Sequence, residues 1–309
     1  MAVLNVLSFT LEVPDLDAGV RFYGNAGLAA VVDGNVAHLR CVGQDRASIV
    51  LVGGAPAKRL HHVALRADDL NGMKRTVADA GGTVVTAPAG FDEDGLWVTD
   101  PHGMLIHLVD READPALASA DPPFEINAPG RLVRKRRSAM LPASSYDPAT
   151  PLKLGHVLLF SPDVMRSVAF VTDGLGMGLA DHAQDVIAFC CAKKDSDHHV
   201  LAFAKSPGIG FHHGSFQVSD PDAVGRGGRA LHTATGKGEW GFGRHTIGSN
   251  FFHYIQDPWG SWFEYYSDMD HIDDHALWTP TNYEMQDSLA SWGPAVPSDF
   301  VHNYEQRGN

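Results

Sequence analysis

An internal repeat constrains the fold of this chain more than any other feature of its sequence. Residues 7–31, LSFTLEVPDLDAGVRFYGNAGLAAV, align with residues 155–180, GHVLLFSPDVMRSVAFVTDGLGMGLA. Each copy reads as an apolar strand, a Pro-Asp turn, a helix and a Gly-Leu exit. A repeat of this length indicates that one structural unit occurs more than once in the fold.

The spacing of apolar residues predicts a helix in each copy, because they recur at i, i+4 and i+7 and so share one helical face. Asp15 and Asp163 precede the helices and are expected to cap them or to act as first-turn acids. The face residues are Leu16, Val20 and Tyr23 in the first copy and Val164, Val168 and Val171 in the second.

Two further pairs of segments extend the repeat. RLHHVALRADDLNGM (59–73) resembles GFHHGSFQVSDPDAV (210–224), and GLWVTDPHGMLIHLVD (95–110) resembles FHYIQDPWGSWFEYYSD (252–268). The Asp-Pro pairs at 100 and 257, each followed by glycine, predict turns between two strands. The chain therefore reads as four units, each a strand, a helix and about three strands.

These units predict an α+β fold of two domains, each built from paired βαβββ modules. We expect an N-terminal domain at 1–112, a linker at 113–150, a second domain at 151–269 and a C-terminal extension at 270–309. The linker is rich in Pro, Ala and Ser. For the extension we expect packing on the surface or on a neighbouring subunit, with a lid over a pocket as the alternative.

The two halves differ where chemistry is expected. In the second half the repeat places His156, His213 and Glu264 at corresponding strand positions, whereas the first half has Ser8, His62 and His107 there. The two halves therefore cannot bind the same ion in the same way. We expect His62 and His107 to be structural histidines or a vestigial site.

Two histidines and one carboxylate leave open positions on a metal ion, which suits nonheme Fe(II) that activates oxygen. A buried glutamate such as Glu264 would cost several kcal/mol unless it were paired or bound to a metal. A single histidine on an apolar strand is more often a core residue, so the prediction depends on the three positions together.

The bulk composition excludes several classes of protein. A formal net charge of -13 disfavours binding to nucleic acid, and the basic cluster RLVRKRR at 131–137 is isolated. No apolar run reaches the ~18 residues of a membrane span, and no secretion signal precedes the first strand. Three cysteines, two of them adjacent, fit core positions in a reducing cytoplasm.

The ordered set GRH, HY, DPWG and FE at 243–264 resembles the type I extradiol ring-cleavage dioxygenases of the vicinal oxygen chelate superfamily, and the likeness covers almost the whole chain. The resemblance implies the two-domain glyoxalase-like fold and an Fe(II) site, with Mn(II) as a possible substitute. It also implies O2 and a catechol as substrates. The ligands would be His156, His213 and Glu264.

The resemblance also implies catalytic residues near the metal. His245 and Tyr254 lie 19 and 10 positions before Glu264, where the family places groups that contact the substrate. A further histidine about 15 positions before His213 would be His198, with His199 as its neighbour and rival. Ile247 stands where relatives that cleave bicyclic catechols often carry a polar residue, so it is a candidate substrate contact.

Two other classes share the expected fold. Glyoxalase-like isomerases and lyases use a divalent metal without redox chemistry, and usually add a fourth protein ligand that this chain lacks at the matching strands. Metal-free binding modules need neither the triad nor the neighbouring histidines. Because such folds commonly assemble, we also expect a homo-oligomer.

Overall fold

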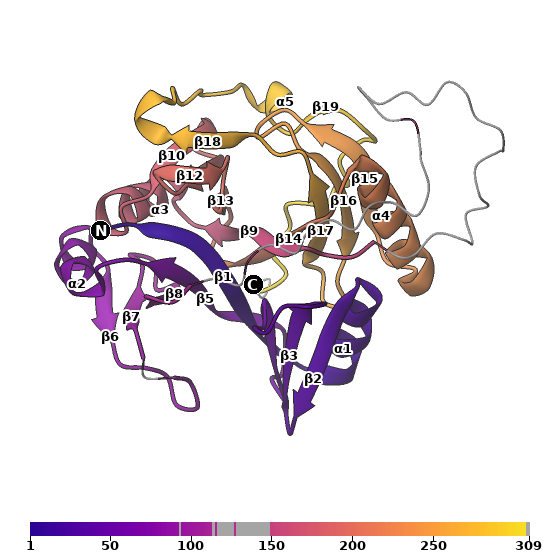
Figure 1. The fold of residues 1–309 in the computed structure, drawn as a ribbon, viewed down its shortest axis with the longest axis horizontal. Coiled ribbons are helices and arrows are strands. Elements are labelled where there is room, and N and C mark those ends of the chain that lie inside the picture. Colours follow the sequence, from indigo (N-terminus) through magenta and orange to yellow (C-terminus); the bar gives the residue numbers. More distant parts are fainter. Residues whose placement is uncertain (93, 113–114, 116–126, 128–148, 307–309) are drawn as a thin grey trace.

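The repeat read from the sequence is present in the structure. The computed structural model describes residues 1–92, 94–112, 115, 127 and 149–306 (Figure 1). Most of the predicted linker, 113–150, lies outside the described residues, so the domain boundaries there stay a prediction. The described chain forms two large mixed sheets, one in each half, and a small sheet of two strands.

The described part of the first half contains eight strands and two helices. Helices α1 and α2 begin after Asp15 and Asp69. Each of these carboxylates accepts the backbone N–H of the residue three positions later, Ala18 or Gly72, and so caps its helix. The elements are β1 Val3–Val13, α1 Leu16–Asn25, β2 Leu28–Asp33, β3 Val36–Cys41, β4 Ile49–Gly53, β5 Arg59–Ala67, α2 Leu70–Asp79, β6 Thr83–Val85, β7 Leu96–Thr99 and β8 Leu105–Val109.

The second half repeats this order. Asp163 caps α3 in the same way, which confirms the predicted caps at Asp15 and Asp163. The elements are β9 Lys153–Ser161, α3 Val164–Ala169 with a π-helical turn η2 Phe170–Gly174, β10 Gly178–Ala183, β11 Ile187–Cys191, β12 Lys194–Asp197, β13 Leu201–Lys205, β14 Gly210–Gln217, α4 Pro221–Thr235, β15 Glu239–His245, β16 Phe251–Gln256 and β17 Trp262–Ser267.

The strand order shows that the two sheets are copies of one plan. The first sheet runs β2-β3-β4-β1-β5-β8-β7-β6, and the second runs β10-β11-β13-β9-β14-β17-β16-β15-β19. In both sheets the central strands, β1 and β5 or β9 and β14, pair antiparallel, and each pairs parallel with the last strand of its own unit. The predicted paired βαβββ modules are therefore confirmed.

The Asp-Pro turns close equivalent hairpins in the two halves. Asp100 Oδ1 accepts hydrogen bonds from the backbone N–H of His102 and Met104, both at 2.8 Å. Asp257 Oδ1 accepts the N–H of Trp259 at 2.8 Å and of Ser261 at 2.9 Å. This side-chain acceptance explains why the same dipeptide occurs at both turns.

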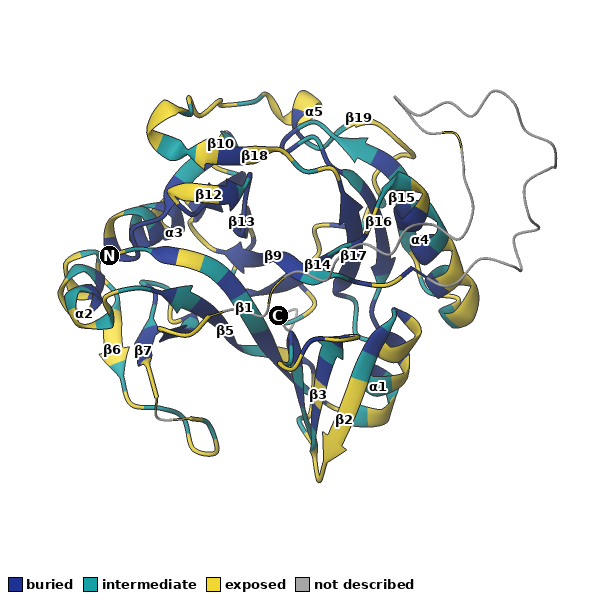
Figure 2. Ribbon diagram, in the orientation of Figure 1, coloured by how far each residue is buried: buried dark blue, intermediate teal, exposed yellow. Residues whose placement is uncertain are grey.

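The two sheets pack against each other through their central strands, which are largely buried (Figure 2). The rings of Phe9 on β1 and Phe211 on β14 lie 4.5 Å apart. Gly214 sits at this contact, and a Cβ there would lie 2.4 Å from Phe9 Cε1, so the close approach requires glycine. All three cysteines are buried and free, as expected for core residues.

The C-terminal extension links the two edges of the second sheet. It contains β18 His271–Asp274, a 3-10 turn η3 His275–Leu277, α5 Met285–Ser288 and β19 Ala290–Trp292. Near its start it bridges to β10 through His182 and Asn282, and β19 then pairs with β15 at the opposite edge. Figure 1 shows this segment crossing the top of the second half. Among the described helices none is long and apolar enough to span a membrane.

Candidate metal centre

Sheet register places the three predicted ligands side by side. Ser215 on β14 pairs with His156 on β9 and with Glu264 on β17, so these residues form a row across the sheet. His213 lies two residues before Ser215 and therefore points to the same face. Ser215 in the middle of the row is small and leaves room between the larger side chains.

Gly155, which precedes the ligand His156, is needed because β9 passes close to Tyr266 at this point. A Cβ at Gly155 would lie 1.9 Å from the Tyr266 hydroxyl oxygen, so a larger residue could not occupy this point of β9. His156 follows directly and is 2% exposed.

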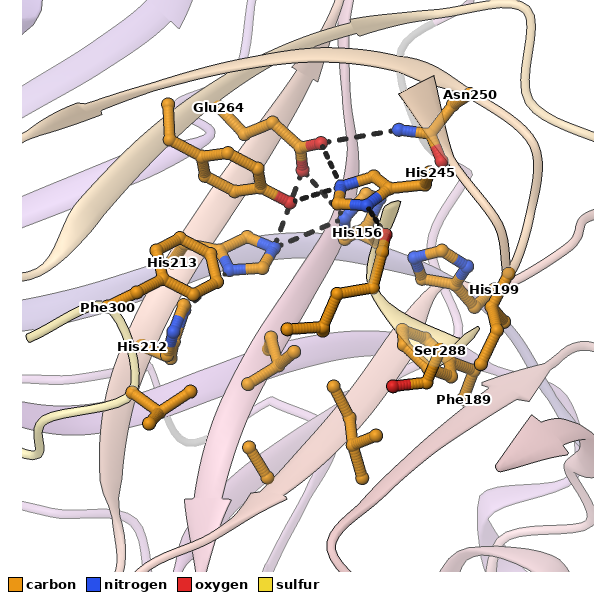
Figure 3. A pocket seen from close by; sticks show the side chains of 17 residues that line it. His156, Phe189, His199, His212, His213, His245, Asn250, Glu264, Ser288 and Phe300 are labelled. Atoms are coloured by element: carbon orange, nitrogen blue, oxygen red, sulfur yellow. Dashed lines mark hydrogen bonds and ion pairs between the residues drawn. The ribbon is translucent and has the colours of Figure 1, made fainter. Parts of the chain in front are cut away.

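The donor atoms of the triad converge. His156 Nε2 lies 3.3 Å from His213 Nε2 and 3.1 Å from Glu264 Oε2, and His213 Nε2 lies 3.5 Å from the same oxygen (Figure 3). Although these atoms are close, Glu264 Oε2 is buried without a well-aligned hydrogen-bond donor in the described chain. The three groups face a common point rather than one another.

This arrangement fits a divalent metal ion. Donors about 2.1 Å from one ion and at right angles to each other lie about 3.0 Å apart, close to the three spacings observed here. Two imidazoles and a carboxylate on one side of the ion leave its other positions open. Among the described residues, His156, His213 and Glu264 form the only group of three potential ligands brought together in this way.

The charge of Glu264 is stabilised by its neighbours. Burial alone would raise the pKa of this carboxyl, but the neighbouring imidazoles of His156, His245 and His213 outweigh it and hold the pKa well below its usual range. Asn250 Nδ2 donates to Glu264 Oε1 at 3.3 Å, which leaves Oε2 directed at the metal position. Burial also keeps the pKa of His213 well below normal, so its ring is neutral and able to bind a metal.

His245 and Tyr254 form a hydrogen-bonded pair beside the triad. The Leu289 carbonyl lies 2.6 Å from His245 Nδ1, so this nitrogen carries the proton and donates it. In the neutral ring Nε2 is then an acceptor, and the Tyr254 hydroxyl lies 2.9 Å from it. Burial and the charge of Glu264 raise the pKa of Tyr254 well above its usual value, so the phenol remains protonated.

His198, one of the predicted catalytic residues, does not line the cavity. His198 is fully buried and turns its Nε2 to the Asp181 carboxylate at 2.8 Å, whereas His199 lines the cavity and its ring centroid lies 4.2 Å from that of His156. The distance in sequence to His213 differs by only one position between His198 and His199, so the sequence could not decide which of the two faces the site. The placement of these rings favours His199 over His198 as the residue beside the metal position, and the catalytic role of either stays a prediction.

The cavity over the triad has a polar end and an apolar end. Its space, counted to the open mouth, is about 520 Å³. In Figure 3 Glu264, Asn250, His156, His213 and His245 lie together at one end, and aliphatic side chains lie at the other end, where Ser288 is also labelled. The predicted contact Ile247 belongs to this lining, and the apolar residues are Leu158, Ile187, Phe189, Ala204, Ile247, Leu289, Phe300 and Val301.

The extension contributes part of the cavity wall. Ser288, Leu289, Phe300 and Val301 line the cavity. Packing on the surface or on a neighbouring subunit does not account for these contacts, which agree with the alternative expectation that the extension covers the pocket. Its sequence does not repeat the βαβββ pattern, so nothing in the repeat predicted this position. Asn250 lies within the repeated module and was missed because only its contact with Glu264 identifies it.

The equivalent row in the first half has a different environment. Ala64 pairs with Ser8 and with His107, and His62 lies two residues earlier, so the predicted correspondence between the halves is confirmed. The His107 ring stacks on Trp97 at 4.1 Å, and its Nε2 lies 2.6 Å from the Asp94 carbonyl. These two histidines contact aromatic rings and backbone rather than a carboxylate.

Comparisons with known proteins agree with this geometry. Residues 153–265 match the model of the Glyoxalase/Bleomycin resistance protein/Dioxygenase superfamily. Metapyrocatechase 2 of Cupriavidus necator is 37% identical over 307 residues, which cover 98% of this chain and 93% of that protein.

Solved structures give the same picture of the fold. The Mn(II)-bound glyoxalase from Novosphingobium aromaticivorans superposes with a TM-score of 0.76 at 26% identity, over 97% of this chain and 95% of that one. Homoprotocatechuate 2,3-dioxygenase from Brevibacterium fuscum superposes with a TM-score of 0.75 at 22% identity, over 98% and 92% of the two chains.

Proposed function

We infer the role of each residue from the premise that the chain belongs to the type I extradiol ring-cleavage dioxygenases, and we propose that it is an Fe(II) enzyme. Enzymes of this family cleave the ring of a catechol with O2. The observation that carries the proposal is the convergence of His156, His213 and Glu264 on one point at the polar end of the cavity. Mn(II) accepts the same ligand types and is the alternative metal.

When bound, the metal ion supplies a Lewis acid for the two catechol oxygens and a path for electrons from the catecholate to O2. The protein's own groups orient the substrate and move protons. Tyr254, whose hydroxyl stays protonated, donates its one proton to His245 Nε2, so its oxygen can accept a hydrogen bond from a catechol hydroxyl that keeps its proton. Together they select which catechol oxygen is bound as the anion.

We assign the acid–base role to His199. Its ring lies beside His156 at the cavity wall, and burial together with the neighbouring imidazoles lowers its pKa well below normal, so it begins the reaction neutral. A neutral imidazole can accept a proton from the substrate and return it later to a leaving oxygen, a contribution of about 10²- to 10⁴-fold in rate. The role expected of His198 passes to this neighbour.

The lining of the cavity supports a catechol with an uncharged substituent. Within the described lining, Glu264 is the only carboxylate and no lysine or arginine is present. A carboxylate substituent at the apolar end would lose its hydration without a cation to replace it. Methyl, larger alkyl, halogen or aryl substituents meet mainly apolar side chains there, with Ser288 as a neutral polar neighbour.

The glyoxalase-like isomerase alternative is less well supported. The chain is 37% identical to a metapyrocatechase over nearly its whole length and 26% identical to the Mn(II)-bound glyoxalase. Assembly as a homo-oligomer and a cytoplasmic location remain proposals drawn from the sequence.

Two variants test these assignments. Glu264→Gln should lose most bound iron, because the anionic ligand is gone, while His199→Asn should bind iron at the wild-type stoichiometry and lose at least about 100-fold in kcat. Iron analysis and oxygen uptake measure the two properties separately. Full iron content in Glu264→Gln, or wild-type turnover in His199→Asn, would contradict the corresponding assignment.

A further inference from the structure

A buried carboxylate outside the metal site is connected to the cavity. Asp181 on β10 is 4% exposed, and a carboxylate in such a position must be paired or hydrogen-bonded. It has two partners. Its Oδ1 accepts the backbone N–H of Thr281, in the extension, at 2.6 Å, and its Oδ2 lies 2.8 Å from His198 Nε2.

These contacts fix the position of the proton on His198. An ionised carboxylate only accepts hydrogen bonds, so His198 Nε2 carries a proton and donates it. In a neutral imidazole the other nitrogen, Nδ1, is then an acceptor. His198 Nδ1 lies 3.1 Å from His199 Nδ1, so His199 donates its Nδ1 proton to that acceptor. His199 is left with a lone pair on Nε2.

The adjacent pair His212 and His213 has the same arrangement. His212 hydrogen-bonds the backbone of Phe300, and its Nδ1 lies 2.7 Å from His213 Nδ1. The unprotonated Nε2 of His213 faces the metal position, as a ligand requires. In each pair, therefore, Nδ1 of the first histidine of an HH dipeptide accepts a hydrogen bond from Nδ1–H of the second, whose Nε2 is left as an acceptor.

We propose that Asp181 and His198 are positioning residues that hold His199 with its proton on Nδ1, so that Nε2 can accept the substrate's proton. This inference rests on the proposed function, because it gives His199 the acid–base role. Asp181 and His198 do not touch the substrate, and they act only through the ring of His199. A catalytic imidazole held in the wrong tautomer loses most of its activity.

Asp181→Asn tests the proposal because the side chain keeps its shape, while the group that faces His198 Nε2 changes from an acceptor to a donor. The Thr281 N–H requires an acceptor, so the new amide oxygen stays on that side and the NH2 group turns to His198 Nε2. His198 must then accept at Nε2 and donate from Nδ1, which moves the proton of His199 to Nε2. The matched control is Asp185→Asn, in the turn after the same strand, where Asp185 forms an exposed ion pair with Lys205.

The first readout is nuclear magnetic resonance of metal-free protein labelled with 15N in histidine. Correlations between ring nitrogens and ring protons distinguish the two neutral tautomers and the doubly protonated form, and His198→Asn and His199→Asn assign the signals. We expect the Nε2–H form of His198 and the Nδ1–H form of His199 in the wild type and in Asp185→Asn, and the Nε2–H form of His199 in Asp181→Asn.

The second readout is kinetic. In Asp181→Asn we expect kcat to fall about tenfold to 100-fold with KM and iron content unchanged. An Nε2–H or doubly protonated His199 in the wild type, a tautomer that Asp181→Asn does not change, or a changed tautomer with wild-type kcat would each overturn the proposal. Absence of ring cleavage by the wild-type enzyme would instead refute the proposed function, and the measured tautomers would still stand.

Discussion

Replacing Lys58 by methionine should destabilise the protein, because this residue forms a buried ion pair between the first half and the end of the extension. Lys58 Nζ lies 2.6 Å from Glu305 Oε1, with the two side chains only 3% and 7% exposed. The ammonium also donates to Ser261 Oγ and to the Phe211 carbonyl, so all three of its protons are used.

The magnitude follows from what each substitution leaves behind. Removing one partner of a buried ion pair costs about 3 to 5 kcal/mol. In Lys58→Met the carboxylate keeps two backbone donors, the N–H groups of Leu60 at 2.9 Å and Phe211 at 3.0 Å, so we expect a loss near the lower limit. Glu305→Ala leaves an unpaired ammonium and two unsatisfied N–H groups, so its loss should be nearer the upper limit.

Urea unfolding of the metal-free variants, followed by tryptophan fluorescence, measures these losses. The control is Arg59→Met, which breaks the exposed pair with Glu12, whose side chains are 62% and 27% exposed. That pair should contribute less than about 1 kcal/mol. Because Phe300 and Val301 line the cavity just before Glu305, we also expect KM for the catechol to rise in Glu305→Ala. A cost for Lys58→Met no larger than that for Arg59→Met would refute the reasoning.

Three other predictions concern the metal site, the pH dependence and the substrate. Asn250→Ala should weaken iron binding about tenfold to 100-fold by releasing Glu264 Oε1, and titration with Fe(II) would detect it. Burial lowers the pKa of His62 to about 3, below the 6.5 expected in the unfolded chain. The folded state therefore binds fewer protons between these values, and stability falls as pH decreases from about 6.5 towards 3. His62→Gln should reduce that slope by about 1.4 kcal/mol per pH unit in urea unfolding at several pH values, and an unchanged slope would contradict the assignment. Methylcatechols should have a kcat/KM at least tenfold above that of carboxylated catechols, and equal values would contradict the uncharged cavity.

The repeated part of the fold could be predicted from the sequence because its physical signals are local. The helical spacing after Asp15 and Asp163 and the Asp-Pro turns appear twice, and each copy supports the other. Comparison of the copies also located His156, His213 and Glu264, since equivalent strand positions lie at equivalent points of equivalent sheets.

Features that depend on contacts between distant segments could not be predicted in this way. The choice between His198 and His199 depends on a hydrogen bond to Asp181, which is 17 residues away in sequence. The extension contributes backbone groups, such as the Leu289 carbonyl that accepts a hydrogen bond from His245. Every residue has such a carbonyl, so the sequence does not indicate which one is used. Asn250 is likewise defined only by its contact with Glu264.

The central claim is tested most directly by oxygen uptake. The protein would be reconstituted with Fe(II) under anaerobic conditions and mixed with oxygenated 4-methylcatechol, while oxygen and the visible spectrum are followed. We expect consumption of one O2 per catechol and a yellow ring-opened product. Stoichiometric bound iron without oxygen uptake on any substituted catechol would contradict it.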